Sequence, residues 1–158
     1  MHMTFLPRTT IIALFLTTTG AMATGNHAHA DADADAGTVG QVSEVKRTVN
    51  VALTDNMRFN PDNISVKEGE TIRFIVRNLG KIKHEFVLGS AREIKEHYDT
   101  MKKFPNMEHA DASMLTVQPQ QSKELIWRFD KSGIVEFACL QPGHYDSGMK
   151  GSVLVSRK

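Results

Sequence analysis

The segment at residues 138–151 (ACLQPGHYDSGMKG) places three metal-binding side chains close together. Cys139, His144 and Met149 follow one another at five-residue intervals. A thiolate, an imidazole and a thioether are soft or borderline donors, which suit copper better than calcium, magnesium or manganese. Glycine and proline residues between them allow a short loop to turn sharply and to point the donors inward. The segment therefore predicts part of a copper site.

A fourth ligand must come from another part of the chain. His84 is the best candidate, because it begins the strand-like segment HEFVLG. Two histidines and one cysteine with a weak axial methionine form the ligand set of a copper electron-transfer site. A purely structural role is the alternative, with Cys139 as a small buried hydrophobe, His144 as a turn residue and Met149 as core filler. A structural zinc site is disfavoured, because such sites are closed tetrahedra without thioether donors.

The first 23 residues have the pattern of a secretory signal peptide. Arg8 is followed by an apolar run at residues 11–16 and by the small-residue site AMA, so we expect cleavage after Ala23. The remaining 135 of 158 residues suit one domain. An exported protein meets oxidising surroundings, where an exposed Cys139 would be oxidised. A bound metal would protect this thiol.

The charge balance and the motifs exclude several classes of protein. Without the signal peptide, 18 basic side chains balance 18 acidic ones, which argues against nucleic-acid binding. No later segment is apolar enough for a stable membrane anchor. The Cys–His pair lacks a nucleophile elbow or an oxyanion loop, so we do not expect an enzyme.

The segment after the signal peptide differs in composition from the rest. Residues 24–40 (TGNHAHADADADAGTVG) are small and polar, which predicts a flexible arm. Its aspartates with His27 and His29 offer an alternative role as a loose metal site. We expect the folded domain to span residues 41–158.

Alternating apolar and polar residues predict about seven short strands, separated by Gly, Pro and Asn turns. They predict an all-β fold of two sheets packed face to face, and the segments are VKRTVNVAL, ISV, TIRFIVRN, HEFVLG, KELIWRFD, GIVEFAC and GSVLVS. Residues 90–105 break this pattern. Ser90 and Glu93 form a capping box, and Ile94, Tyr98 and Met101 make one apolar stripe, which together predict a short helical insert.

The sequence resembles the cupredoxins, or type 1 copper proteins. The resemblance rests on DNMRFNPDNISVKEGETIRFIVRN, KHEFVLG and GIVEFACLQPGHYDSGMKGSVLVS, and covers residues 44–89 and 115–156. It implies a Greek-key β-sandwich with one type 1 copper per chain, held in a plane by His84, Cys139 and His144 with Met149 axial. Glu85 departs from the family, which often has Asn there. We expect Glu85 either to lower the reduction potential or to point outward.

Two functions fit the resemblance. The first is a monomeric periplasmic electron carrier that meets a redox partner protein transiently through His144 and an apolar patch around Leu140, Leu79 and Ile82. The second is a periplasmic copper-tolerance protein that binds, sequesters or oxidises excess copper. The second function is supported by a group of histidines and methionines in and after the helical insert: His97, Met101, Met107, His109 and Met114. In this interpretation, Met107 and His109 hold a weak second copper ion. The alternative is that these side chains form a packing stripe on the helix and ordinary loop residues.

Overall fold

The computed structural model describes residues 36–158 except 106 and 108. The predicted signal peptide and the arm up to residue 35 lie outside the described residues. Among the helices that are described, none is long and apolar enough to cross a membrane.

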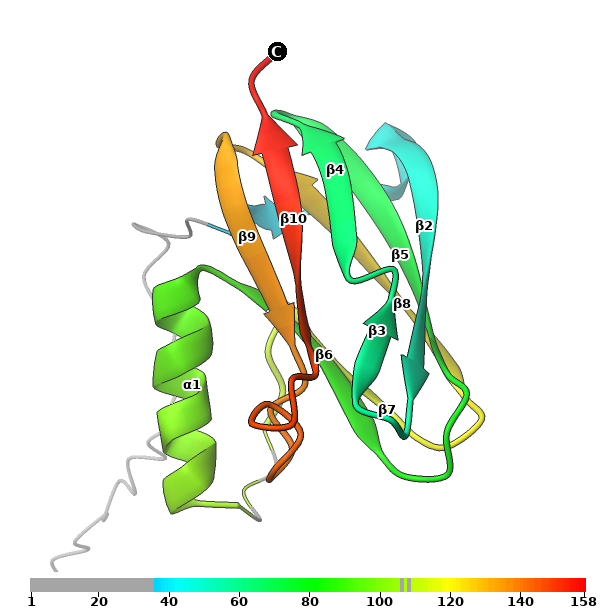
Figure 1. Ribbon diagram of the computed structural model, residues 1–158. Helices are drawn as coiled ribbons and strands as arrows, with labels where there is room; N and C mark the ends of the chain where they lie inside the picture. Colours follow the sequence, from blue (N-terminus) through cyan, green and yellow to red (C-terminus); the bar gives the residue numbers. More distant parts are fainter. Residues whose placement is uncertain (1–35, 106, 108) are drawn as a thin grey trace, which may run out of the picture. The chain divides into compact units, whose positions relative to one another are not determined.

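Two five-stranded sheets form the domain (Figure 1). The first sheet has the order β1-β8-β5-β2-β3, with strands Thr38–Val39, Ser122–Phe129, Glu70–Asn78, Val45–Thr54 and Arg58–Asn60. The second has the order β4-β10-β9-β6-β7, with strands Asn63–Lys67, Lys150–Ser156, Gly133–Ala138, His84–Gly89 and Met114–Val117. A 3-10 turn at Val42–Glu44 precedes β2. The predicted all-β sandwich is confirmed.

Apolar side chains from both sheets form one core. Phe74 of β5 lies 5.5 Å from Phe86 of β6, measured between ring centroids, and Phe86 lies 5.2 Å from Phe137 of β9. All three rings are fully buried. Tilted and edge-to-face aromatic contacts of this kind add to the free energy gained from burial. The core therefore fixes β6 and β9 against the opposite sheet, and these two strands lead to the predicted metal ligands.

The folded region begins before the predicted boundary at residue 41. Thr38 and Val39 pair with Arg128 and Trp127 of β8. The Trp127 indole Nε1–H also donates a hydrogen bond to the carbonyl of Ala36, at 2.7 Å. The end of the predicted arm is thus an edge strand, which its small, polar composition did not suggest.

The predicted helical insert is helix α1, Ala91–Lys103. Ser90 caps it through the expected capping box with Glu93. Ile94 and Met101 are buried, and Tyr98 packs beside them. Helix α1 packs against β6 and β9, so the insert covers one face of the second sheet (Figure 1). The loop that was predicted after the helix ends at β7, Met114–Val117. The sequence pattern did not indicate this short strand.

Candidate metal centre

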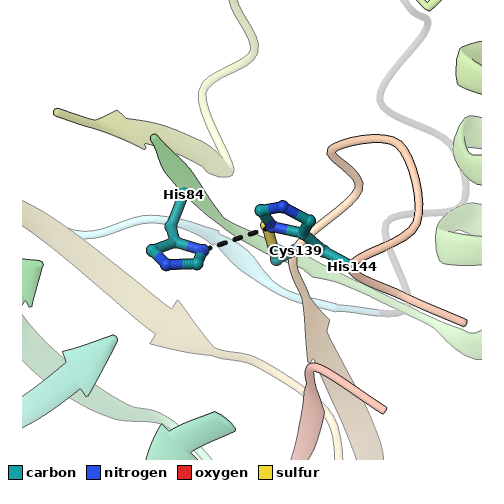
Figure 2. A group of neighbouring side chains, drawn as sticks. All are labelled: His84, Cys139 and His144. Carbon is teal, nitrogen blue, oxygen red and sulfur yellow. Dashed lines mark hydrogen bonds between the residues drawn. The ribbon is translucent and has the colours of Figure 1, made fainter. Parts of the chain in front are cut away.

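The structure brings His84, Cys139 and His144 together at one end of the sandwich (Figure 2). His84 begins β6 and Cys139 follows β9; these strands pair antiparallel, with Val87 opposite Ala138. Cys139 Sγ lies 3.2 Å from His144 Nδ1, and His84 Nδ1 also lies 3.2 Å from His144 Nδ1. One donor atom from each residue falls within 4.8 Å of the others.

Asp55 orients His84 by contacting Nε2, the ring nitrogen that does not face His144. Its Oδ1 lies 3.2 Å from His84 Nε2, and its Oδ2 accepts a hydrogen bond from the Lys81 backbone N–H at 2.7 Å. The Lys81 hydrogen bond is the largest cause of the lowered pKa of Asp55, and His84 adds to it. An ionised carboxylate at Nε2 holds the ring proton there, so that Nδ1 keeps its lone pair toward Cys139 and His144. No residue pattern around Asp55 in the sequence indicates this role.

Gly80 is needed for this arrangement. A β-carbon at Gly80 would lie 1.8 Å from Asp55 Oδ1, which no side chain tolerates. The Gln120 side-chain amide donates hydrogen bonds to the carbonyls of Leu79 and Gly80, at 3.0 and 2.8 Å. The loop before His84 is therefore fixed closely against Asp55.

Cys139 is fully buried and is the single cysteine of the chain. Burial raises the pKa of its thiol to about 12, because a thiolate is poorly solvated there. The Glu85 backbone N–H donates a hydrogen bond to Sγ at 3.3 Å. Without a cation the thiol thus stays protonated, whereas a bound cation would displace the proton.

His144 lies on a tight loop between β9 and β10. Its backbone N–H donates to the carbonyl of Gln141, and the Gly148 N–H donates to that of Tyr145. Gly143 and Gly148 have φ values of 81° and 90°, which favour glycine. His144 is half-buried, and burial followed by the nearby His84 lowers its pKa. It is therefore neutral near pH 7, as a metal ligand must be.

Met149 is fully buried beside these residues. Its carbonyl accepts a hydrogen bond from the Cys139 N–H at 3.0 Å, and its own N–H donates to the carbonyl of His144 at 3.1 Å. The backbone of Met149 thus links the two ends of the loop. Its role as the axial ligand stays a prediction.

Glu85 does not point outward. Only 4% of its surface is exposed, and its Oε1 accepts a hydrogen bond from the Gln141 side-chain amide. This contact joins the strand after His84 to the loop that holds His144. Glu85 Oε2 is buried and has no hydrogen-bond partner among the described residues.

Other residues singled out from the sequence lie elsewhere. Leu140 is buried under helix α1, so its expected place in an exposed apolar patch is wrong. Leu79 and Ile82 are 47% and 41% exposed, as such a patch requires. His97 and His109 lie outside the His84–Cys139–His144 group and face each other.

The donor set fits copper. Two imidazole nitrogens and one sulfur converge. His84 Nδ1 and His144 Nδ1 face each other at 3.2 Å, so at most one of them can carry a proton. A thiol with two imidazoles suits Cu(I) and Cu(II), whereas oxygen donors would suit magnesium or calcium. His84, Cys139 and His144 would hold the ion, and it would supply a one-electron couple.

A β-sandwich with such a donor group at one end defines a cupredoxin, and the chain belongs to the copper-binding proteins of the plastocyanin/azurin family. The model of that family matches residues 45–156. The cofactor is therefore copper.

Relatives in three bacteria agree with this membership. The chain is 44% identical over 152 residues to the copper-resistant cuproprotein CopI of Rubrivivax gelatinosus, which covers 92% of each chain. Proteins of the same name from Vibrio cholerae and Pseudomonas aeruginosa are 38% and 35% identical; the matches cover 70% and 73% of this chain, and 66% and 79% of theirs.

Solved structures show the same fold. Auracyanin from Roseiflexus castenholzii superposes with a TM-score of 0.62 at 21% identity, over 71% of this chain and 98% of auracyanin. Auracyanin B superposes with a TM-score of 0.59 at 21% identity, over 77% and 96%.

Proposed function

We propose that this cupredoxin is a one-electron carrier of the periplasm that takes part in copper tolerance, and that it is a carrier rather than an enzyme. The observation behind the proposal is the convergence of Cys139 Sγ with one ring nitrogen from each of His84 and His144, all within 4.8 Å of one another. Copper tolerance is suggested by the relatives called copper-resistant cuproproteins. A periplasmic location is suggested by the signal-peptide pattern of residues 1–23.

The protein's own residues keep the donors in place in both oxidation states. His84 is fixed by Asp55, and Cys139 is held by β9 and by the Glu85 N–H. Met149 would complete the set as a fourth donor. Because these supports belong to the sandwich and not to the ion, little needs to move when an electron arrives. With copper bound, these residues would supply a site whose donors keep their positions when one electron is gained or lost.

The electron path follows from burial. His84 and Cys139 are fully buried, whereas His144 is half-buried. The loop after β5, which carries the exposed Leu79 and Ile82, lies at the same end of the sandwich (Figure 1). A small apolar surface near one accessible imidazole suits brief contacts with a redox partner. We propose that a monomer meets its partner protein there.

Copper handling is the second candidate function, because the relatives are called copper-resistant. In that case the chain would bind, sequester or oxidise excess copper, and rapid electron transfer would not be needed. One double variant separates the two candidates. Leu79→Lys/Ile82→Lys adds charge to the apolar surface but leaves the three donor residues in place.

The double variant is compared with the wild type in three measurements. We expect the copper content and the visible spectrum of the wild type, but a slower electron self-exchange rate by NMR, since two positive surfaces must meet. Copper tolerance is then measured in a strain that lacks the wild-type protein. Lost tolerance supports the electron carrier, whereas full tolerance supports copper handling. A Cys139→Ser variant that keeps the visible band would refute the site itself.

A further inference from the structure

The four histidines of the described residues form two pairs with facing ring nitrogens. His84 and His144 belong to the copper centre. His97 and His109 form the other pair, with their Nε2 atoms 2.5 Å apart and their ring centroids 4.5 Å apart. Both pairs place one ring nitrogen directly against another. The second pair has no role in the function proposed above.

The second pair joins two atoms that are each common metal donors. Either one Nε2–H donates to the other Nε2, or both Nε2 atoms direct a lone pair at the same point. Burial, and then the nearby His109, lowers the pKa of His97, so a doubly charged pair is excluded at neutral pH. Two imidazole nitrogens whose lone pairs point at one spot suit a cation placed between them.

The tautomer of His109 supports a metal. Its Nδ1 lies 3.4 Å from the carbonyl of Met107, and because a carbonyl oxygen only accepts, this contact favours the tautomer with the proton on Nδ1. The Nε2 atom then keeps its lone pair toward His97. Metal-binding histidines in proteins are usually oriented in this way, by a carbonyl or carboxylate at the other ring nitrogen.

The two histidines have supports of different stiffness. His97 lies on α1, which is fixed by its capping box and by the buried Ile94 and Met101. The Tyr98 hydroxyl also donates a hydrogen bond to Asp146 at 2.6 Å. His109 lies outside the helices and strands, so regular backbone hydrogen bonds do not fix its separation from His97. Asp111, which acts on His97 electrostatically, adds a negative charge nearby.

We propose that His97 Nε2 and His109 Nε2 bind a second copper ion, at a site separate from the His84–Cys139–His144 centre. Imidazole donors suit copper, and divalent copper has the highest affinity in the first transition series for such sites. Met107, which is 41% exposed and two residues before His109, is the candidate soft third donor. The site has no thiolate, so copper bound there lacks the strong visible band of a copper–thiolate centre.

Copper counting tests the proposal. The exported chain is prepared with His27→Ala and His29→Ala, because these arm histidines would also bind copper. It is loaded with copper, desalted and measured by elemental analysis and native mass spectrometry. We expect two copper ions per chain in this background. His97→Ala and His109→Ala should each leave one, with the visible band unchanged, and Lys103→Ala on the same helix should leave two.

The outcomes separate this site from the first one. One copper ion in the background chain, or two in the His97→Ala/His109→Ala double variant, would overturn the second site. His109→Ala changes only the loop, so a loss of the visible band in that variant would refute the independence of the two sites. Cys139→Ser should remove the band but leave one copper ion. Complete displacement of the second ion by equimolar zinc would overturn its assignment to copper.

Discussion

Asp55 provides the sharpest test of how the fold prepares the copper centre. Its two carboxylate oxygens serve two donors: His84 Nε2 at 3.2 Å and the Lys81 N–H at 2.7 Å. In an Asp55→Asn variant only one oxygen remains, and the amide N–H₂ must face one of these donors. The His84 ring then loses either its orientation or the support of its loop.

We expect the Asp55→Asn variant to bind copper about 10–100-fold more weakly, which is the usual effect of removing a group that orients a metal-binding histidine. The pKa of Asp55 is lowered, chiefly by the Lys81 hydrogen bond. The ionised carboxylate is therefore present above its ordinary pKa and is lost only as the pH falls through the lowered value. The difference between variant and wild type should thus be the same at pH 6 and pH 8.

The assay is a competition titration with a chelator of known copper affinity, followed by the visible band. Asp62→Asn is the matched control, because Asp62 is exposed and contacts none of the donors. Gly80→Ala should act like Asp55→Asn, since its methyl group would displace the Asp55 carboxylate. If Asp55→Asn binds copper within twofold of the Asp62→Asn control, the carboxylate does not prepare His84, and the reasoning is wrong.

Three further predictions concern other parts of the structure. Copper binding at pH 7.5 should release about one proton per ion, because the Cys139 thiol has a pKa of about 12. Calorimetry in buffers of different ionisation enthalpy measures the number of protons released, and no release would contradict a buried thiol. Glu85→Gln should raise the reduction potential measured by voltammetry, because it removes a buried carboxylate near the thiolate. Glu136→Gln is the control variant. An unchanged potential in Glu85→Gln would mean that the Glu85 carboxyl is neutral. Ser90→Ala should lower the free energy of unfolding by about 1 kcal/mol through loss of the helix cap; urea denaturation measures it against Ser132→Ala, and equal midpoints would contradict a stabilising cap.

The predictable features were those encoded over short stretches of sequence. Alternating residues such as Ile72, Phe74 and Val76 indicated buried strands, and all three are fully buried. The capping box of Ser90 and Glu93 spans four residues and located the helix start. The Cys139–His144 spacing likewise lies within one loop. In each case, neighbouring residues and local geometry were enough.

Features that depend on distant pairing could not be predicted in this way. Asp55 contacts His84 across 29 positions of the sequence. The contact exists because β2 pairs in parallel with β5, which places Leu53 opposite Asn78 and the two following loops at one end. No residue pattern near Asp55 marks this. The contact of Ala36 with Trp127 spans 91 positions of the sequence. The small residues around Ala36 gave no sign of an edge strand.

The supports of the three proposed copper ligands differ, and this difference has a functional consequence. His84 and Cys139 lie at the ends of two paired core strands, and both are fully buried. His144 lies on a loop held by turn hydrogen bonds and by two glycines in the left-handed region. The ligand with the least rigid support is therefore also the one nearest to solvent. Contacts between a partner and this loop would act on the copper through His144, whereas the buried ligands would keep their positions.

The Gln141–Glu85 hydrogen bond limits the movement of the His144 loop, since it joins the loop to the strand that begins at His84. The two residues thus take the place of the Asn that often follows the first histidine in cupredoxins, with a carboxyl group instead of an amide.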